Sequence, residues 1–140
     1  MREKINYLKS EMQSYNFYVR EYRRLQEEIA EIDYKLTGVS GIDYTKPMNK
    51  NKVYTMSNFY ELMLKQDDLK PRAKIYEENI KLINQLLGSV DSLYRGIIED
   101  IYINKCSTYE KIANKNYRSV RSLKSNVDRQ IRKFIKEKGM

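Results

Sequence analysis

The sequence lacks histidine and has a single cysteine, Cys106, among its 140 residues. Zinc and related metals need imidazole or thiolate ligands, so a protein-built site for them is nearly excluded. A histidine general base is equally absent. The acidic residues lie at helical spacing among basic ones, which favours a solvated helix face over paired catalytic carboxylates. We therefore expect no enzyme, no cofactor and no metal site.

Glycine and proline are also scarce, with five and two residues, so turn-rich β structure and low-complexity disorder are disfavoured. No stretch approaches the length of uncharged apolar residues that a transmembrane helix needs. The segment "MREKINYLKSEM" alternates charged with apolar residues, unlike a signal peptide. One cysteine forms no internal disulfide, so we expect a cytoplasmic protein with no membrane partner.

Positive charge is concentrated at one end of the chain. The formal net charge is +8, and residues 105–140 hold 11 of the 27 basic residues but only three of the 19 acidic ones. The preceding 104 residues are therefore electrically balanced. This distribution predicts a polyanionic partner for the C-terminal segment.

The first helix is expected over residues 2–37. Its apolar residues follow alternating steps of three and four, with one step of three at Tyr22–Leu25 where four is due. That spacing is a heptad stripe with one stammer, and a partner helix must cover it. The stripe consists of Ile5, Leu8, Met12, Tyr15, Val19, Tyr22, Leu25, Ile29, Ile32 and Leu36.

A second helical region is expected from about residue 57 to 87, after a loop at 38–56 that begins near Gly38 and Gly41. Pro71 predicts a kink or restart near 68–71, which would turn Ile75, Ile80, Ile83 and Leu87 inward. Pairing with the first helix predicts a coiled-coil-like antiparallel hairpin over 1–88, for interaction or oligomerisation. Pairing between two chains, and hence a homodimer, is the alternative.

The C-terminal domain, 89–140, is expected to hold a helix-turn-helix. A helix over 90–103 carries Val90, Leu93, Ile97, Ile101 and Tyr102 at core spacing. In "TYEKIANKNYRSV", Ser107 or Thr108 is suited to cap a short helix, and Ser119 is suited to cap a helix over 120–136. Small Ala113 suits the point where these two helices approach most closely.

The last helix divides into an apolar face and a polar face at 100° per residue. Val120, Leu123, Val127, Ile131 and Phe134 form the first face. The opposite face is rich in arginine, lysine and serine, which suit phosphates and base edges in a major groove. We expect the bases to be contacted by Arg121, Ser122, Ser125 and Asn126, and the phosphates by Arg118, Lys124, Arg129 and Arg132.

The segment "LYRGIIEDIYINKCSTYEKIANKNYRSVRSLKSNVDRQIRKF" resembles the region-4-type helix-turn-helix of sigma factors, with Ile112-Ala113, Ser119 and Leu123 at matching spacings. The layout as a whole resembles phage-encoded ArpU/RinA-like regulators of Gram-positive bacteriophages. The family usually has leucine and glycine where this chain has Asn116 and Tyr117. Asn116 tolerates a left-handed turn, which would leave Tyr117 to pack inward in place of the leucine.

The resemblance implies a transcription regulator, a late-gene activator that binds double-stranded DNA in a bacterial host. Two other functions fit the same pattern. One is an interaction module that binds RNA polymerase or a sigma factor through the hairpin. The other is the small DNA-recognition subunit of a phage packaging machine, which would use the same kinds of helices.

Overall fold

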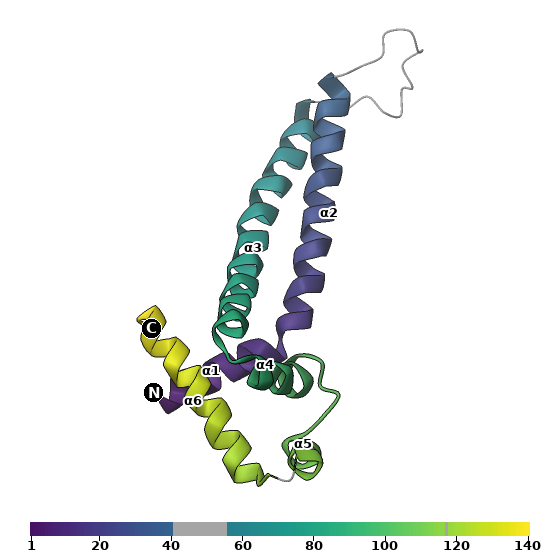
Figure 1. The fold of residues 1–140 in the computed structure, drawn as a ribbon. Coiled ribbons are helices and arrows are strands. Elements are labelled where there is room, and N and C mark those ends of the chain that lie inside the picture. Colours follow the sequence, from purple (N-terminus) through teal and green to yellow (C-terminus); the bar gives the residue numbers. More distant parts are fainter. Residues whose placement is uncertain (41–55, 117) are drawn as a thin grey trace. The chain divides into compact units, whose positions relative to one another are not determined.

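The computed structural model describes residues 1–40, 56–116 and 118–140, and all of the regular elements among them are helical (Figure 1). The predicted all-α class is confirmed. The elements are α1 (Arg2–Gln13), α2 (Tyr15–Ser40), α3 (Met56–Ser89), α4 (Ser92–Ile98), a π-helical segment η2 (Glu99–Ile103), α5 (Tyr109–Asn116) and α6 (Val120–Lys138).

The chain divides into two compact units. Met1–Val19 and Glu78–Met140 form one, here called the terminal unit, and Arg20–Glu77 forms the other, the middle unit. We expected a division at residue 88, and the structure places it elsewhere. The reason is that Ile83 and Leu86, near the end of α3, belong to the same buried cluster as α1 and α6.

In the middle unit, α2 and α3 pack through one small apolar cluster. Leu25, Ile29 and Ile32 of α2 are buried with Leu69 and Ala73 of α3. The amide of the buried Gln66 donates a hydrogen bond to the carboxylate of Asp33, which joins the two helices.

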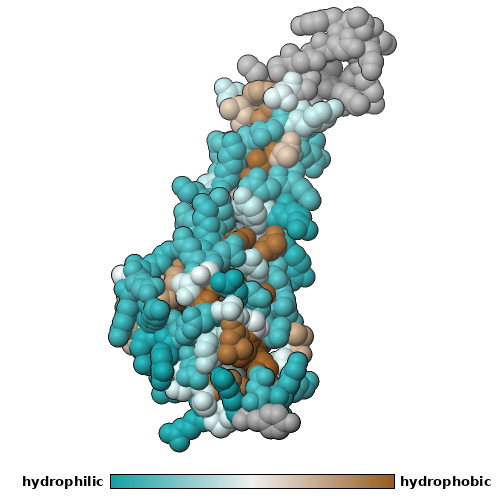
Figure 2. Space-filling model, viewed as in Figure 1, coloured by the Kyte–Doolittle hydropathy of each residue, from teal (hydrophilic) through white to brown (hydrophobic). Residues whose placement is uncertain are grey.

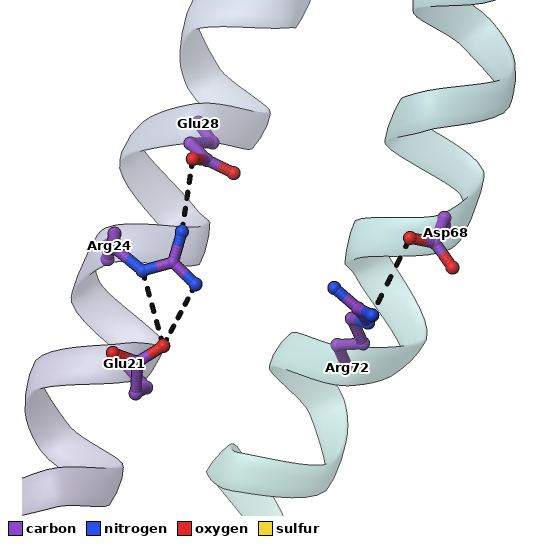
Figure 3. Close-up of polar contacts among 5 residues, drawn as sticks. All are labelled: Glu21, Arg24, Glu28, Asp68 and Arg72. Carbon is purple, nitrogen blue, oxygen red and sulfur yellow. Dashed lines mark hydrogen bonds and ion pairs between the residues drawn. The ribbon is translucent and has the colours of Figure 1, made fainter.

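Each ion pair in Figure 3 joins two residues of the same helix. Arg24 contacts Glu21 at 2.9 Å and Glu28 at 3.1 Å on α2, while Arg72 lies 3.9 Å from Asp68 on α3. Exposed pairs at this spacing contribute a few tenths of a kcal/mol each. The apolar cluster and the Gln66 hydrogen bond are therefore what joins the helices here.

We expected a kink or restart near Pro71, and α3 does not restart there but runs through the proline as one helix. Buried Leu69 and Ala73 lie on either side of the proline and hold the helix through the lost backbone bond. The helical phase set by Leu69 therefore continues and brings Tyr76 to the core. Ile75, which we expected to face inward, is 58% exposed.

The single helix expected over 2–37 is also interrupted, at Ser14. The N–H of Ser14 donates to the carbonyls of both Ser10 and Glu11, so the chain makes one irregular turn before α2 begins. The stammer at Tyr22–Leu25 lies close to the boundary between the units. Residues before it pack in the terminal unit and residues after it pack in the middle unit.

At its other end α2 extends to Ser40, so Gly38 does not stop the helix. Gly41 and most of the loop expected at 38–56 lie outside the described residues. On the face in Figure 2, hydrophilic residues cover most of the described surface, and hydrophobic residues show as separate patches. None of the helices in the described ranges is both long and apolar enough to cross a membrane.

The buried core of the terminal unit draws on α1, α3, α4, η2, α5 and α6. The helix expected over 90–103 is α-helical only to Ile98 and then widens into η2. The π-helical turn spaces buried residues five apart, as in Ile97–Tyr102 and Ile98–Ile103. Leu93, which we expected in the core, lies in the first turn of α4 and is 54% exposed.

Candidate nucleic-acid interface

The short helix α5 begins and ends as its sequence predicts, with one exception. The hydroxyl of Thr108 accepts a hydrogen bond from the N–H of Lys111 at 3.2 Å and caps the helix. At the other end, the N–H of Arg118 donates to the carbonyl of Ala113 at 3.0 Å. Asn116 does not carry a left-handed turn. Asn116 is the last residue of α5. Among the described non-glycine residues, Lys105 is the one with a positive φ.

The predicted inward packing of Tyr117 concerns a residue outside the described ranges. The contact between α5 and α6 is nevertheless defined by their other residues. Tyr109, Ile112 and Ala113 of α5 are buried in one cluster with Leu123 and Val127 of α6. Ala113 is 3% exposed, as expected for a small residue at a close helix–helix contact.

The helix α6 begins at a capping serine, as predicted. Ser119 is extended, with φ −80° and ψ 148°, and its hydroxyl accepts the N–H of Ser122 at 3.0 Å. Gly139, with φ 74°, follows the last turn in the left-handed conformation that glycine tolerates best. The buried face is Leu123, Val127, Ile131, Phe134 and Ile135. The helix is thus fixed at its start, at its end and along one side.

The opposite face of α6 carries five of the eight predicted contact residues on the solvent side, and a sixth, Arg118, is exposed just before the helix. These exposed residues are Arg118, Arg121, Ser122, Ser125, Arg129 and Arg132. Asn126 is half-buried and lies away from the centre of this face. Lys124 is exposed but turns toward the side of α6, where its Nζ lies 5.5 Å from the centre of the Tyr109 ring.

Further basic residues extend this face toward the C-terminus. Lys133 and Lys136 join Arg129 and Arg132 around a shallow hollow of about 420 Å³. They follow the same three- and four-residue spacing as the predicted contacts, so the sequence already held the signal for them. We call Arg121, Ser122, Ser125, Arg129, Arg132, Lys133 and Lys136 the outer face of α6.

A second hollow, of about 580 Å³, lies beside α6 and is here called the α1–α6 groove. Arg2 and Lys9 of α1 line it together with Lys124, Asp128 and Arg132 of α6. Lys9 and Asp128 form an ion pair at 2.5 Å. No pattern in the sequence pointed to Arg2 and Lys9, because they lie more than a hundred residues before α6.

Tyr102 of η2 and Tyr109 of α5 also line the α1–α6 groove. Their hydroxyls are buried and hydrogen-bonded to each other at 2.6 Å. Burial, followed by the hydrogen bond with Tyr102, raises the pKa of Tyr109 above its usual range. The Tyr109 hydroxyl is therefore neutral near pH 7 and available as a hydrogen-bond group.

Within the ranges that the structure describes, no three potential metal-ligating side chains lie close together. The thiol of Cys106 is exposed and lies 3.8 Å from the carboxylate of Asp100. Comparison with known proteins finds no matching family model, no similar curated protein and no similar solved structure.

Proposed function

We propose that the protein is a sequence-specific DNA-binding regulator that reads the major groove with the outer face of α6. The observation that carries the proposal is the division of this helix. Its inner face is fully packed, while its outer face presents arginine, lysine and serine side chains to solvent. A helix held rigidly behind and positively charged in front suits insertion into a groove flanked by phosphates.

The two ends of α6 would make different contacts. Arg121 and Ser125 lie near its beginning, where a recognition helix approaches base edges, and arginine forms two hydrogen bonds with guanine. Arg129 and Arg132 lie one to two turns later, where phosphate contact is favoured. Ser122 and Ser125 are short, which permits close approach of the helix axis to the bases.

The salt dependence of binding tests the electrostatic part of the proposal. Affinity for duplexes selected from a random pool should fall steeply with salt, with a log–log slope of about 0.9 for each phosphate contact. A slope near zero would contradict phosphate contact altogether. The selected sequences would also reveal whether the site is a single element or two half-sites.

Arginine substitutions test the assignment of roles. Arg121→Ala should weaken binding to the selected site by about 1–3 kcal/mol and weaken random DNA much less. Arg129→Ala should weaken binding to the selected site and to random DNA by the same degree, and it should reduce the salt slope by about one. Arg23→Ala removes the same charge from an exposed residue of the middle unit and serves as the control. If Arg121→Ala behaves like this control, base contact by the outer face is refuted.

The middle unit supports a second, compatible function as a homodimerisation surface. Tyr34, Tyr60, Leu64 and Ile75 are between 58% and 78% exposed. A single DNA-reading helix covers few base pairs, so useful specificity usually requires a second copy. Sedimentation of the full chain should show a dimer that Leu64→Lys weakens, while Lys65→Gln, at an exposed neighbouring residue, leaves it unchanged. A wild-type chain that stays monomeric contradicts this surface.

A further inference from the structure

The α1–α6 groove has an unusual balance of charges. Four cations line it, Arg2 and Lys9 from α1 with Lys124 and Arg132 from α6, against the single carboxylate of Asp128. Asp128 is already paired with Lys9 at 2.5 Å. Among the described residues, no carboxylate forms an ion pair with Arg2, Lys124 or Arg132. Cations gathered without counterions repel one another and create a positive potential that favours an anion.

The tyrosine pair adds a neutral donor to this groove. Tyr102 and Tyr109 are 7% and 9% exposed, and their two hydroxyls share one hydrogen bond. Each hydroxyl carries one proton, so the bond between them uses one, and among the described residues no side chain or carbonyl accepts the other. A buried donor without an acceptor is unfavourable. An oxygen of a bound ligand would satisfy it.

We propose that the α1–α6 groove binds a phosphate ester. Arginine binds phosphate through paired N–H donors and lysine binds it as a point charge, so both cation types here suit the group. The volume of about 580 Å³ exceeds what a bare phosphate fills and leaves room for an attached sugar.

The ester could come from two sources, the backbone of a DNA duplex or a free nucleotide. The groove shares Arg132 with the outer face of α6, so a duplex on that face would bring phosphates near it. The duplex source therefore rests on the proposed function, whereas the free-nucleotide source does not. In both cases the ligand would join α1 to α6 across the groove.

Two matched double variants separate the groove from general charge. Arg2→Gln/Lys124→Gln removes two groove cations, and both residues are exposed, so the fold should be kept. Lys4→Gln/Lys65→Gln removes the same charge from exposed residues that do not line the groove. Lys124→Arg keeps the charge and should retain binding, which distinguishes a ligand contact from a folding defect. Thermal unfolding of each variant checks that the fold is intact.

The first measurement is an NMR titration of the full chain with thymidine monophosphate, with thymidine as the uncharged control. Binding in the groove should shift the resonances of Tyr102 and Tyr109. The groove variant should weaken this binding at least about tenfold, and the control variant should not. This result would support the free-nucleotide source and is independent of DNA binding.

The second measurement is duplex affinity as a function of salt. If the groove holds backbone phosphates, the groove variant should lower the log–log slope by about two relative to the control variant. A chain that binds no duplex would overturn the proposed function but would leave the nucleotide titration to decide this site. If neither measurement separates the two double variants, the phosphate-ester site is overturned.

Discussion

The buried tyrosine pair allows the packing of the terminal unit to be tested by a double-mutant cycle. The hydroxyls of Tyr102 and Tyr109 bond to each other at 2.6 Å, and the two rings meet edge to face with centres 6.2 Å apart. Phenylalanine keeps the ring contact and removes only the hydroxyl. Each single variant strands the remaining hydroxyl, at a cost of about 1–3 kcal/mol, whereas removing both hydroxyls should be nearly neutral.

Urea unfolding of the four chains measures this coupling directly. The double variant Tyr102→Phe/Tyr109→Phe should be more stable than either single variant, which gives a coupling energy of about 1–3 kcal/mol. Tyr7→Phe is the matched control, because Tyr7 is 50% exposed and its change should stay within about 0.5 kcal/mol. The reasoning is refuted if the double variant loses the sum of the two single losses.

Three further predictions concern the protonation of the tyrosines, Pro71 and Ser119. Burial raises the pKa of Tyr18 from 10.0 to about 12, and it also raises the pKa of Tyr109. As the pH rises, these two tyrosines therefore lose their protons in the unfolded chain before they do so in the folded chain. Stability should be complete below pH 10 and fall as pH rises toward 12 in urea titrations, less so in Tyr109→Phe. Pro71→Ala should raise the free energy of unfolding by up to about 3 kcal/mol, and an unchanged midpoint would contradict a helical Pro71. Ser119→Ala should lower it by about 1 kcal/mol, and no loss in calorimetry would argue against the cap.

The features predicted correctly from the sequence are those set by residues close together in the chain. Thr108 and Ser119 cap α5 and α6 because a capping hydroxyl reaches an N–H only three residues ahead. The inner face of α6 is equally local, since an apolar residue every three or four positions defines one side of any helix. Five of the predicted contact residues, Arg121, Ser122, Ser125, Arg129 and Arg132, are exposed on the other side for the same reason, and their contact with DNA stays a prediction.

Predictions that needed a continuous helical phase failed where that phase changes. The π-helical turn at Glu99–Ile103 places Tyr102 and Ile103 in the core, whereas Ile101, which we expected there, is only partly buried. At Pro71 we expected a kink or restart, and α3 continues through the proline without a restart. In both places, burial of distant partners outweighs local preference, and local spacing alone does not reveal those partners.

By itself, the sequence determined the all-α class, the concentration of positive charge near α6 and the two faces of that helix. These depend on composition and on the fixed period of a helix, which need no knowledge of partners. The tertiary structure alone decided that α1 packs with α6 and that the core draws on both ends of the chain. It therefore decided that Arg2 and Lys9 share a groove with Lys124 and Arg132, because burial of apolar surface, rather than position in the chain, sets which residues become neighbours.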